Sequence, residues 1–206
     1  MEFNGKGGDI LYEQQRVAVI GAGAAGMMSA IYAAQNGALV TVFEKNDRVG
    51  KKLAITGKGR CNVTNDCDTQ ELLKNIISNP KFLYAAFSNF DTQDTKAFFE
   101  SLGVPLKTER GRRVFPVSDK AMDIVLALKK CMLDYGVTLK HERVTEILEL
   151  DGNVSGIKTD RATYEFDAVI VVCFPSTLAF YEEISGFFFF FNMFFVFLFF
   201  RKDSEK

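Results

Sequence analysis

The strongest constraint on the fold is a glycine-rich stretch that follows a short β-branched run near the start of the chain. The run "VAVI" at 17–20 leads directly into "GAGAAG", and "MMSAIYAAQNG" continues with apolar residues at helical spacing. This order predicts a strand, a tight turn and a helix that ends at Gly37. "LVTVFE" at 39–44 predicts a second buried strand, whose parallel return requires a right-handed crossover through the helix. The sequence therefore predicts a βαβ unit, the beginning of an α/β fold with a parallel sheet.

The glycines of this turn match the pattern GxGxxG in the context that gives it meaning. Gly21 permits the tight turn, Gly23 lets the backbone approach a pyrophosphate, and Gly26 allows the helix to pack closely on the strand. The helix N-terminus offers unpaired N–H groups to phosphate charge. A Gly/Ala-rich turn without any ligand fits the pattern as well, so the pattern alone leaves both possibilities open.

Glu44 favours a nucleotide over an empty turn. It ends the second predicted strand 18 residues after Gly26, close to the spacing of about 20 at which a carboxylate accepts hydrogen bonds from ribose hydroxyls. A carboxylate there repels a 2'-phosphate, which disfavours NADP at this site. A solvated acid at a strand end is the alternative. FAD and NAD share such a cradle, and the choice between them depends on the next segment.

Charge and reactive residues exclude several function classes. The formal net charge of −1 over 206 residues creates no field that would attract nucleic acid, which favours a small ligand. The only histidine, His141, has no HExxH context, and we expect no metal site and no Ser/His/Asp relay. No CxxC pair occurs, which indicates a reducing compartment and a cytoplasmic protein. The cysteines are Cys61, Cys67, Cys131 and Cys173.

The middle of the chain predicts a loop, helices and a hairpin. Residues 46–69 are rich in Gly, Lys, Asn and Asp and predict a long loop of the kind that is usually functional. A helical segment covers about 80–135, interrupted by a hairpin that turns at Arg110-Gly111. Its first helix spans roughly 81–90, its second follows a cap at Asp91 or Thr92, and its third follows a cap at Ser118. The third helix is expected to bury Met122, Val125, Leu128, Cys131 and Met132 on one face.

The segment at about 137–166 predicts a small antiparallel meander. It consists of the short alternating runs "VTLK", "VTEILEL", "VSGIKT" and "ATYEFD". Asp151-Gly152 marks a tight hairpin between two of them. "AVIVV" at 168–172 is apolar throughout, which is typical of a strand buried inside a parallel sheet.

Two further segments carry a family resemblance. The run "VIGAGAAGMMSA…FEKNDRVGKKLAITGKGRCNVTN", followed by "ERGRRVFPVSDKA", resembles the BaiN-type (YhiN-like, aminoacetone oxidase-like) FAD-dependent oxidoreductases over roughly residues 16–172. The "GKGRCNVTN" and "RVFPVSDKA" segments are far more specific than GxGxxG. The resemblance implies a Rossmann-like FAD-binding domain of glutathione-reductase type, with a parallel sheet, crossover helices and the meander. It also implies NAD(P)H as a candidate electron donor and a small organic substrate.

The resemblance further implies which residues bind FAD. The pyrophosphate would meet the glycine-rich turn and the adenosine ribose would meet Glu44, with residues of the following segment along the cofactor and near the flavin. A redox role for Cys61 is disfavoured against a packing role. No catalytic residue is assigned, because the flavin carries the redox chemistry; Arg113 and Asp119 could reach a substrate, and hairpin pairing explains them as well. The implied cofactor-binding residues are Gly21, Gly23, Ala25, Gly26, Glu44, Lys45, Gly50, Lys52, Arg60, Cys61, Asn62 and Val144.

After residue 172 the family pattern breaks. The expected glycine-rich "ATGG"-type turn is replaced by "CFPSTLAFYEEISG", and residues 187–200 hold 10 of the 21 phenylalanines. A membrane anchor is disfavoured, because spanning needs about 20 apolar residues and Asn192 interrupts this shorter run. We expect a truncated domain at 16–172, a flexible leader at 1–15, and an aberrant tail at 173–206 that is not native family sequence. An unpaired sheet edge would then make the chain fold poorly or hold FAD weakly.

Two functions of different class remain open at this point. The first is an FAD-dependent oxidoreductase of a small organic substrate. The second is a non-catalytic fragment that retains only the dinucleotide-binding fold. An NAD-dependent dehydrogenase is a third, disfavoured reading, because NAD needs no second lysine-rich segment such as "GKGRCN".

Overall fold

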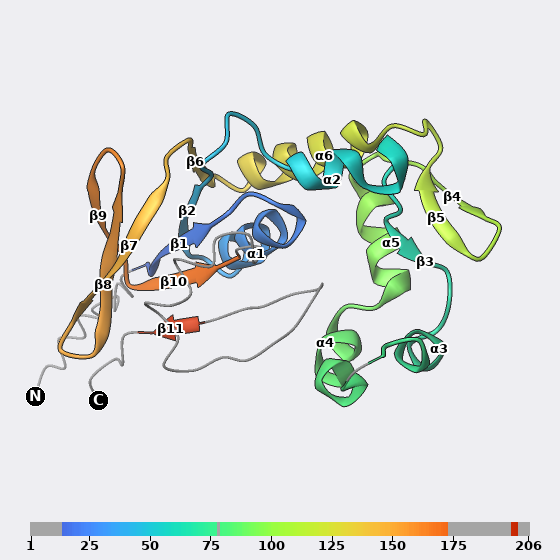
Figure 1. Ribbon diagram of the computed structural model, residues 1–206, viewed down its shortest axis with the longest axis horizontal. Coiled ribbons are helices and arrows are strands. Elements are labelled where there is room, and N and C mark those ends of the chain that lie inside the picture. Colours follow the sequence, from blue (N-terminus) through green and yellow to red (C-terminus); the bar gives the residue numbers. More distant parts are fainter. Residues whose placement is uncertain (1–13, 78, 173–198, 202–206) are drawn as a thin grey trace, which may run out of the picture.

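The computed structural model describes residues 14–77, 79–172 and 199–201 and contains the predicted parallel sheet. Its strand order is β11-β10-β1-β2-β6; β10, β1, β2 and β6 run parallel to one another, and β11 runs antiparallel to β10 (Figure 1). The prediction of a Rossmann-like α/β fold is confirmed. The strands are β1 (Arg16–Ile20), β2 (Leu39–Phe43), β6 (Thr138–Lys140), β10 (Ala168–Val171) and β11 (Phe199–Arg201).

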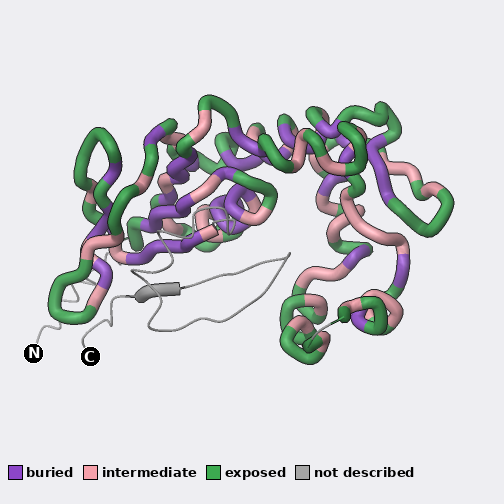
Figure 2. The backbone as a smooth tube through the Cα atoms, in the orientation of Figure 1, coloured by how far each residue is buried: buried purple, intermediate pink, exposed green. Residues whose placement is uncertain are grey.

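The two faces of this sheet are covered by different structures. Side chains alternate along a strand, so Val17 and Val19 of β1 pack in the same cluster as helices α1 (Ala24–Gln35) and α6 (Ala121–Asp134). Ala18 and Ile20 point to the other face and pack against the meander. Figure 2 shows the buried residues concentrated in these strands and in α1. A strand buried on both faces must be apolar throughout, which explains "VAVI" and "AVIV".

The meander forms a separate three-stranded sheet, β7-β8-β9, at one end of the molecule (Figure 1). Asp151 and Gly152 both have positive φ, 53° and 78°, as the tight hairpin turn requires. The prediction was wrong for "VTLK": β6 pairs in parallel with β2 instead of joining the meander. A run of three alternating residues looks the same in a parallel sheet as in an antiparallel meander. The strand that β6 pairs with is determined by the crossover through α6, which brings it to β2. The strands are β7 (Val144–Leu150), β8 (Asn153–Thr159) and β9 (Thr163–Glu165).

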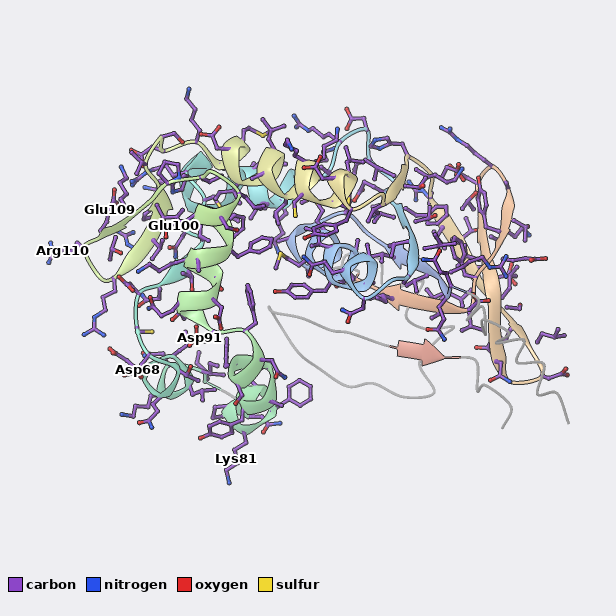
Figure 3. The ribbon with its side chains drawn as sticks, turned by 180° about the vertical axis from the view of Figure 1, so that it is seen from behind. Asp68, Lys81, Asp91, Glu100, Glu109 and Arg110 are labelled. Atoms are coloured by element: carbon purple, nitrogen blue, oxygen red, sulfur yellow. The ribbon has the colours of Figure 1, made fainter. Side chains whose placement is uncertain are left out.

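The opposite end of the molecule holds the predicted hairpin and the smaller helices. β4 (Leu106–Glu109) and β5 (Arg113–Pro116) pair around a turn that includes Gly111, and β3 (Thr64–Asn65) adds to β5. Asp91 caps α5 through a capping box, as expected (Figure 3). The helices are α3 (Thr69–Lys74), η2 (Pro80–Leu83), α4 (Tyr84–Asn89) and α5 (Thr92–Ser101).

Asp66 ties this end of the molecule together. Its carboxylate accepts hydrogen bonds from Lys96 Nζ at 2.9 Å, Gln93 Nε2 at 3.0 Å and Thr108 Oγ1 at 2.9 Å. These donors, led by Lys96, hold the pKa of Asp66 well below its usual range. One carboxylate thus joins the turn after β3 to both α5 and β4.

Three local predictions were wrong. The expected loop at 46–69 contains α2 (Lys51–Ile55), the 3-10 turn η1 (Thr56–Gly59) and β3, elements too short to show a hydrophobic period. Ser118 does not cap α6, which begins at Ala121 after Lys120 without a side-chain cap. Met122 is 44% exposed, because the buried face is centred on Ile124, Leu128 and Met132.

The ends of the chain lie mostly outside the described residues. This holds for most of the predicted leader and for residues 173–198 and 202–206 of the predicted tail. The described strand β11 pairs antiparallel with β10, so the expectation of an open edge at β10 was wrong. Within the described parts of the chain, no helix combines the length and the apolar character needed to cross a membrane.

Candidate nucleotide-binding site

The turn from β1 to α1 requires two of its glycines for steric reasons within the protein. Gly21 has a φ of +106°, and a Cβ there would lie 2.5 Å from the carbonyl oxygen of Val172. A Cβ on Gly26 would lie only 1.8 Å from the carbonyl oxygen of Gly21. Both oxygens belong to the backbone and cannot turn away as a side chain could. Gly21 and Gly26 are therefore explained by the fold itself.

Gly23 is different, because nothing in the described structure requires a glycine there. Its φ of −77° and ψ of −173° suit any residue, and no atom of the described residues lies within 4 Å of a Cβ built on it. Gly23 is the N-cap of α1, where the described chain supplies no side-chain cap and no acidic residue in the first turn. The first N–H groups of a helix have no intrahelical acceptor and favour an anion. Ala25 lies half-buried in this first turn.

Glu44 lies directly beside this turn. Its side chain is 8% exposed, and its Oε2 accepts a hydrogen bond from the Ala22 N–H at 2.9 Å. The carbonyl of Ala22 in turn accepts from the N–H of Gly50 at 2.8 Å. Ala22 of the glycine-rich turn is therefore hydrogen-bonded to this segment twice, through its N–H to Glu44 and through its carbonyl oxygen to Gly50. At the carboxyl end of β2, Oε1 of Glu44 also accepts hydrogen bonds from the backbone N–H and the side-chain amide of Asn46.

Of the next three residues predicted to bind the cofactor, two are exposed to solvent and one packs inside the protein. Lys45 and Lys52 are exposed. Gly50 has a φ of +65°, and a Cβ there would come within 2.8 Å of the Val125 side chain of α6. Its glycine is thus explained by packing against α6, and Gly50 also joins the turn through the hydrogen bond to Ala22.

Arg60, Cys61 and Asn62 lie in the loop after η1, next to the hairpin. Cys61 is 1% exposed, and burial raises the pKa of its thiol, which fits the packing role favoured over a redox role. Arg60 forms ion pairs with Glu109 and Asp119. The hydrogen bonds from Lys107 and Arg60 hold the pKa of Asp119 below its usual range.

Val144 begins β7, a few residues after the end of β6. It therefore follows the carboxyl end of the parallel sheet, the same end at which Glu44 follows β2. The segment before it is attached to this end: Nδ1 of His141 lies 2.6 Å from the carbonyl oxygen of Asn46. The backbone N–H of Asn46 donates to Oε1 of Glu44 at 2.9 Å. Sequence reasoning missed Asn46, because an Asn directly after a strand looks like any loop residue.

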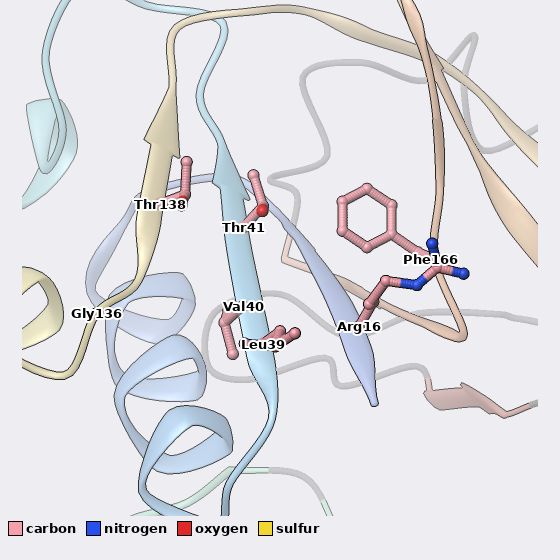
Figure 4. A pocket seen from close by; sticks show the side chains of 7 residues that line it. All are labelled: Arg16, Leu39, Val40, Thr41, Gly136, Thr138 and Phe166. Atoms are coloured by element: carbon pink, nitrogen blue, oxygen red, sulfur yellow. The ribbon is translucent and has the colours of Figure 1, made fainter. Parts of the chain in front are cut away.

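Two hollows among the described residues lie away from this turn. One of about 220 Å³ is at the amino ends of β1, β2 and β6 (Figure 4), whereas ligands of open α/β sheets bind at the carboxyl ends. Arg16, which lines it, is paired with Glu165 and Asp167. The other, of about 390 Å³, lies between α5 and α6. The described chain also contains no cluster of three or more residues able to hold a metal ion.

Two curated relatives are similar in sequence to this chain. The 3-dehydro-bile acid delta(4,6)-reductase of Clostridium scindens is 32% identical over 160 residues, which are 77% of this chain and 38% of that protein. The ribosomal RNA dihydrouridine synthase of Haemophilus influenzae is 31% identical over 121 residues, which are 59% of this chain and 29% of that protein. The chain thus spans less than two fifths of the length of either relative.

Two solved structures have a fold similar to that of this chain. The 3-ketosteroid-delta4-(5alpha)-dehydrogenase of Rhodococcus jostii superposes with a TM-score of 0.58 at 16% identity, over 79% of this chain and 47% of that one. The glycine oxidase of Bacillus cereus superposes with a TM-score of 0.54 at 13% identity, over 82% and 58%. Both superpositions show a shared fold.

The HI0933-like protein Rossmann domain matches residues 15–177, so the predicted resemblance is confirmed and the chain belongs to the HI0933-like family.

Proposed function

We propose that this chain is the FAD-binding part of a cytoplasmic FAD-dependent oxidoreductase that takes electrons from NAD(P)H and acts on a small organic molecule. Membership in the HI0933-like family supports the oxidoreductase class. The net charge of −1 supports a small substrate over nucleic acid. The cysteines of the described chain are free thiols, which supports the location.

The observation that carries the proposal is the position of Gly23 at the N-terminus of α1. Gly23 has neither a backbone conformation nor a neighbour that requires a glycine. Glycine suits the N-cap position, and without a side chain it also leaves the N-terminus of α1 open to the close approach of a ligand. The N–H groups of the first turn of α1 would bind the pyrophosphate at this point. Gly21, Gly26 and Ala25 would shape the turn around it.

Glu44 supports the nucleotide part of the proposal. Its buried carboxylate would accept hydrogen bonds from the adenosine ribose, and it would repel a 2'-phosphate. Val144 would meet the adenine from β7, and Lys45, Gly50 and Lys52 would line the cofactor along α2. Arg60, Cys61 and Asn62 would lie toward the flavin end. Bound FAD supplies the electron-transfer chemistry, while these residues bind and orient it.

Replacing Glu44 by glutamine tests the proposal. Glu44→Gln should weaken FAD binding about tenfold, because one hydrogen bond to a charged group is worth about 1.5–3 kcal/mol and tenfold in affinity is about 1.4 kcal/mol. The dissociation constant is measured by titrating flavin fluorescence. Glu100→Gln is the matched control, because Glu100 is exposed on α5, away from the turn (Figure 3). Equal FAD affinity in Glu44→Gln and wild type would contradict the proposed role of the carboxylate.

A further inference from the structure

The loop after α2 has an unusual backbone that must be held in place by its surroundings. Gly57, Lys58, Gly59 and Cys61 have φ angles of +57°, +58°, +84° and +59°. For Lys58 and Cys61, which carry side chains, such a conformation costs roughly 1–2 kcal/mol each. The loop adopts it only if other contacts outweigh this cost.

Arg60 makes the contacts that connect this loop to three other places in the chain. Its Nε and Nη2 donate to Oδ1 of Asp119 at 2.8 and 2.6 Å, and Nη2 also donates to Glu109. Its Cζ lies 4.2 Å from the centre of the Phe115 ring, within the range of a cation–π contact. Glu109 ends β4, Phe115 lies in β5, and Asp119 precedes α6.

The same ring supports the loop at a second point. A Cβ on Gly57 would lie 3.2 Å from Cε1 of Phe115 and 2.9 Å from the backbone nitrogen of Asn62. Phe115 itself is 2% exposed. The N–H of Val63 donates to the carbonyl of Val114 at 2.8 Å, which fixes the end of the loop on the same strand. The loop therefore wraps around the ring of Phe115, with Arg60 on its face.

Arg60 shares its two carboxylates with a second cation. Lys107 lies 2.8 Å from Asp119 Oδ2 and 3.4 Å from Glu109 Oε1. The guanidinium of Arg113 also lies near, 5.6 Å from the centre of the Phe115 ring. The guanidinium of Arg60 is thus engaged by protein groups, and its contribution to a cofactor site comes through the loop that it holds.

We infer that Arg60 is a positioning residue for the cofactor: stacked on Phe115 and paired with Glu109 and Asp119, it fixes residues 57–62 in the conformation that receives the flavin end of FAD. The inference rests on the proposed function and revises the expected direct contact between Arg60 and the cofactor. It makes the β4–β5 hairpin the support of the flavin end, while the glycine-rich turn and Glu44 serve the adenosine end.

Two probes separate the two ends of the cofactor. ADP carries only the adenosine and diphosphate, whereas FAD also carries the flavin. Arg60→Met should leave the dissociation constant for ADP unchanged, weaken FAD binding about tenfold, and alter the visible circular dichroism of the bound flavin. Arg110→Met is the matched control, because Arg110 is exposed at the tip of the same hairpin (Figure 3). All measurements use the full chain.

A second variant distinguishes positioning from direct binding. Asp119 has a φ of +58°, which asparagine tolerates, so Asp119→Asn removes the charge with little backbone cost. Positioning through the cluster predicts weaker FAD binding, by about threefold. Direct binding predicts equal or tighter FAD binding, since Arg60 would be released from a carboxylate.

The outcomes separate the inference from the function on which it rests. Wild-type chain that binds neither probe overturns the proposed function. Wild-type chain that binds FAD, with Arg60→Met binding it equally well, overturns the positioning role alone. Loss of ADP as well as FAD in Arg60→Met, or equal or tighter FAD binding in Asp119→Asn, also overturns it.

Discussion

Replacing Gly26 by alanine is expected to lower the free energy of unfolding by about 3 kcal/mol, because overpacking against atoms that cannot move costs roughly that much. The new Cβ would lie 1.8 Å from the carbonyl oxygen of Gly21. Alanine is favoured over glycine inside a helix by about 1 kcal/mol, which is too little to offset the clash. Stability is measured by urea unfolding followed by circular dichroism.

The control for this variant is Gly23→Ala, which lies in the same turn and has no described neighbour to clash with. It should lower the free energy of unfolding by no more than about 1 kcal/mol, because alanine is a poorer N-cap than glycine, and so by much less than Gly26→Ala. Equal stability of Gly26→Ala and wild type would contradict the close approach of α1 to β1 that the structure shows.

Gly23→Ala is itself expected to have the largest effect on cofactor binding. A methyl group at this place would stand between the backbone and the pyrophosphate, and we expect a loss of about 2 kcal/mol, or roughly 30-fold in FAD affinity. The loss should also appear with ADP, because both ligands carry the diphosphate. The dissociation constants are measured by calorimetry. Unchanged affinity in a folded Gly23→Ala protein would mean that the pyrophosphate does not approach this turn.

Much of the fold could be predicted from the sequence, because local patterns determine it. "VAVI", the glycines and the apolar period to Gln35 predict β1, the turn and α1, and each of these lies where expected. The pair Asp151-Gly152 likewise predicts the hairpin of the meander. In these cases the residues that decide the structure are neighbours in the chain.

Other features depend on partners that are far apart in the chain. β6 becomes a parallel strand because α6 returns it to the edge of β2, which the three residues Thr138–Lys140 cannot reveal. α2 is only five residues long and shows no period. Its start depends on Gly50, whose glycine is required by packing against Val125 in a distant helix.

The contacts of Arg60 could not be predicted from the sequence either, because its partners are also distant along the chain. Its partners Glu109 and Asp119 are 49 and 59 residues away along the chain. The sequence predicted Arg60 as a residue near the cofactor but gave no signal for its two carboxylates or for the ring of Phe115. Only the folded chain shows that the guanidinium is occupied by protein groups.

The visible absorption spectrum of the purified full chain tests the central claim most directly. If the glycine-rich turn, Glu44 and the loop held by Arg60 form an FAD site, the folded protein will carry flavin absorbance through gel filtration, or take it up when FAD is added. Denaturing the protein will then release FAD in a one-to-one ratio with the chain. A folded protein that is colourless and takes up no added FAD would contradict the claim.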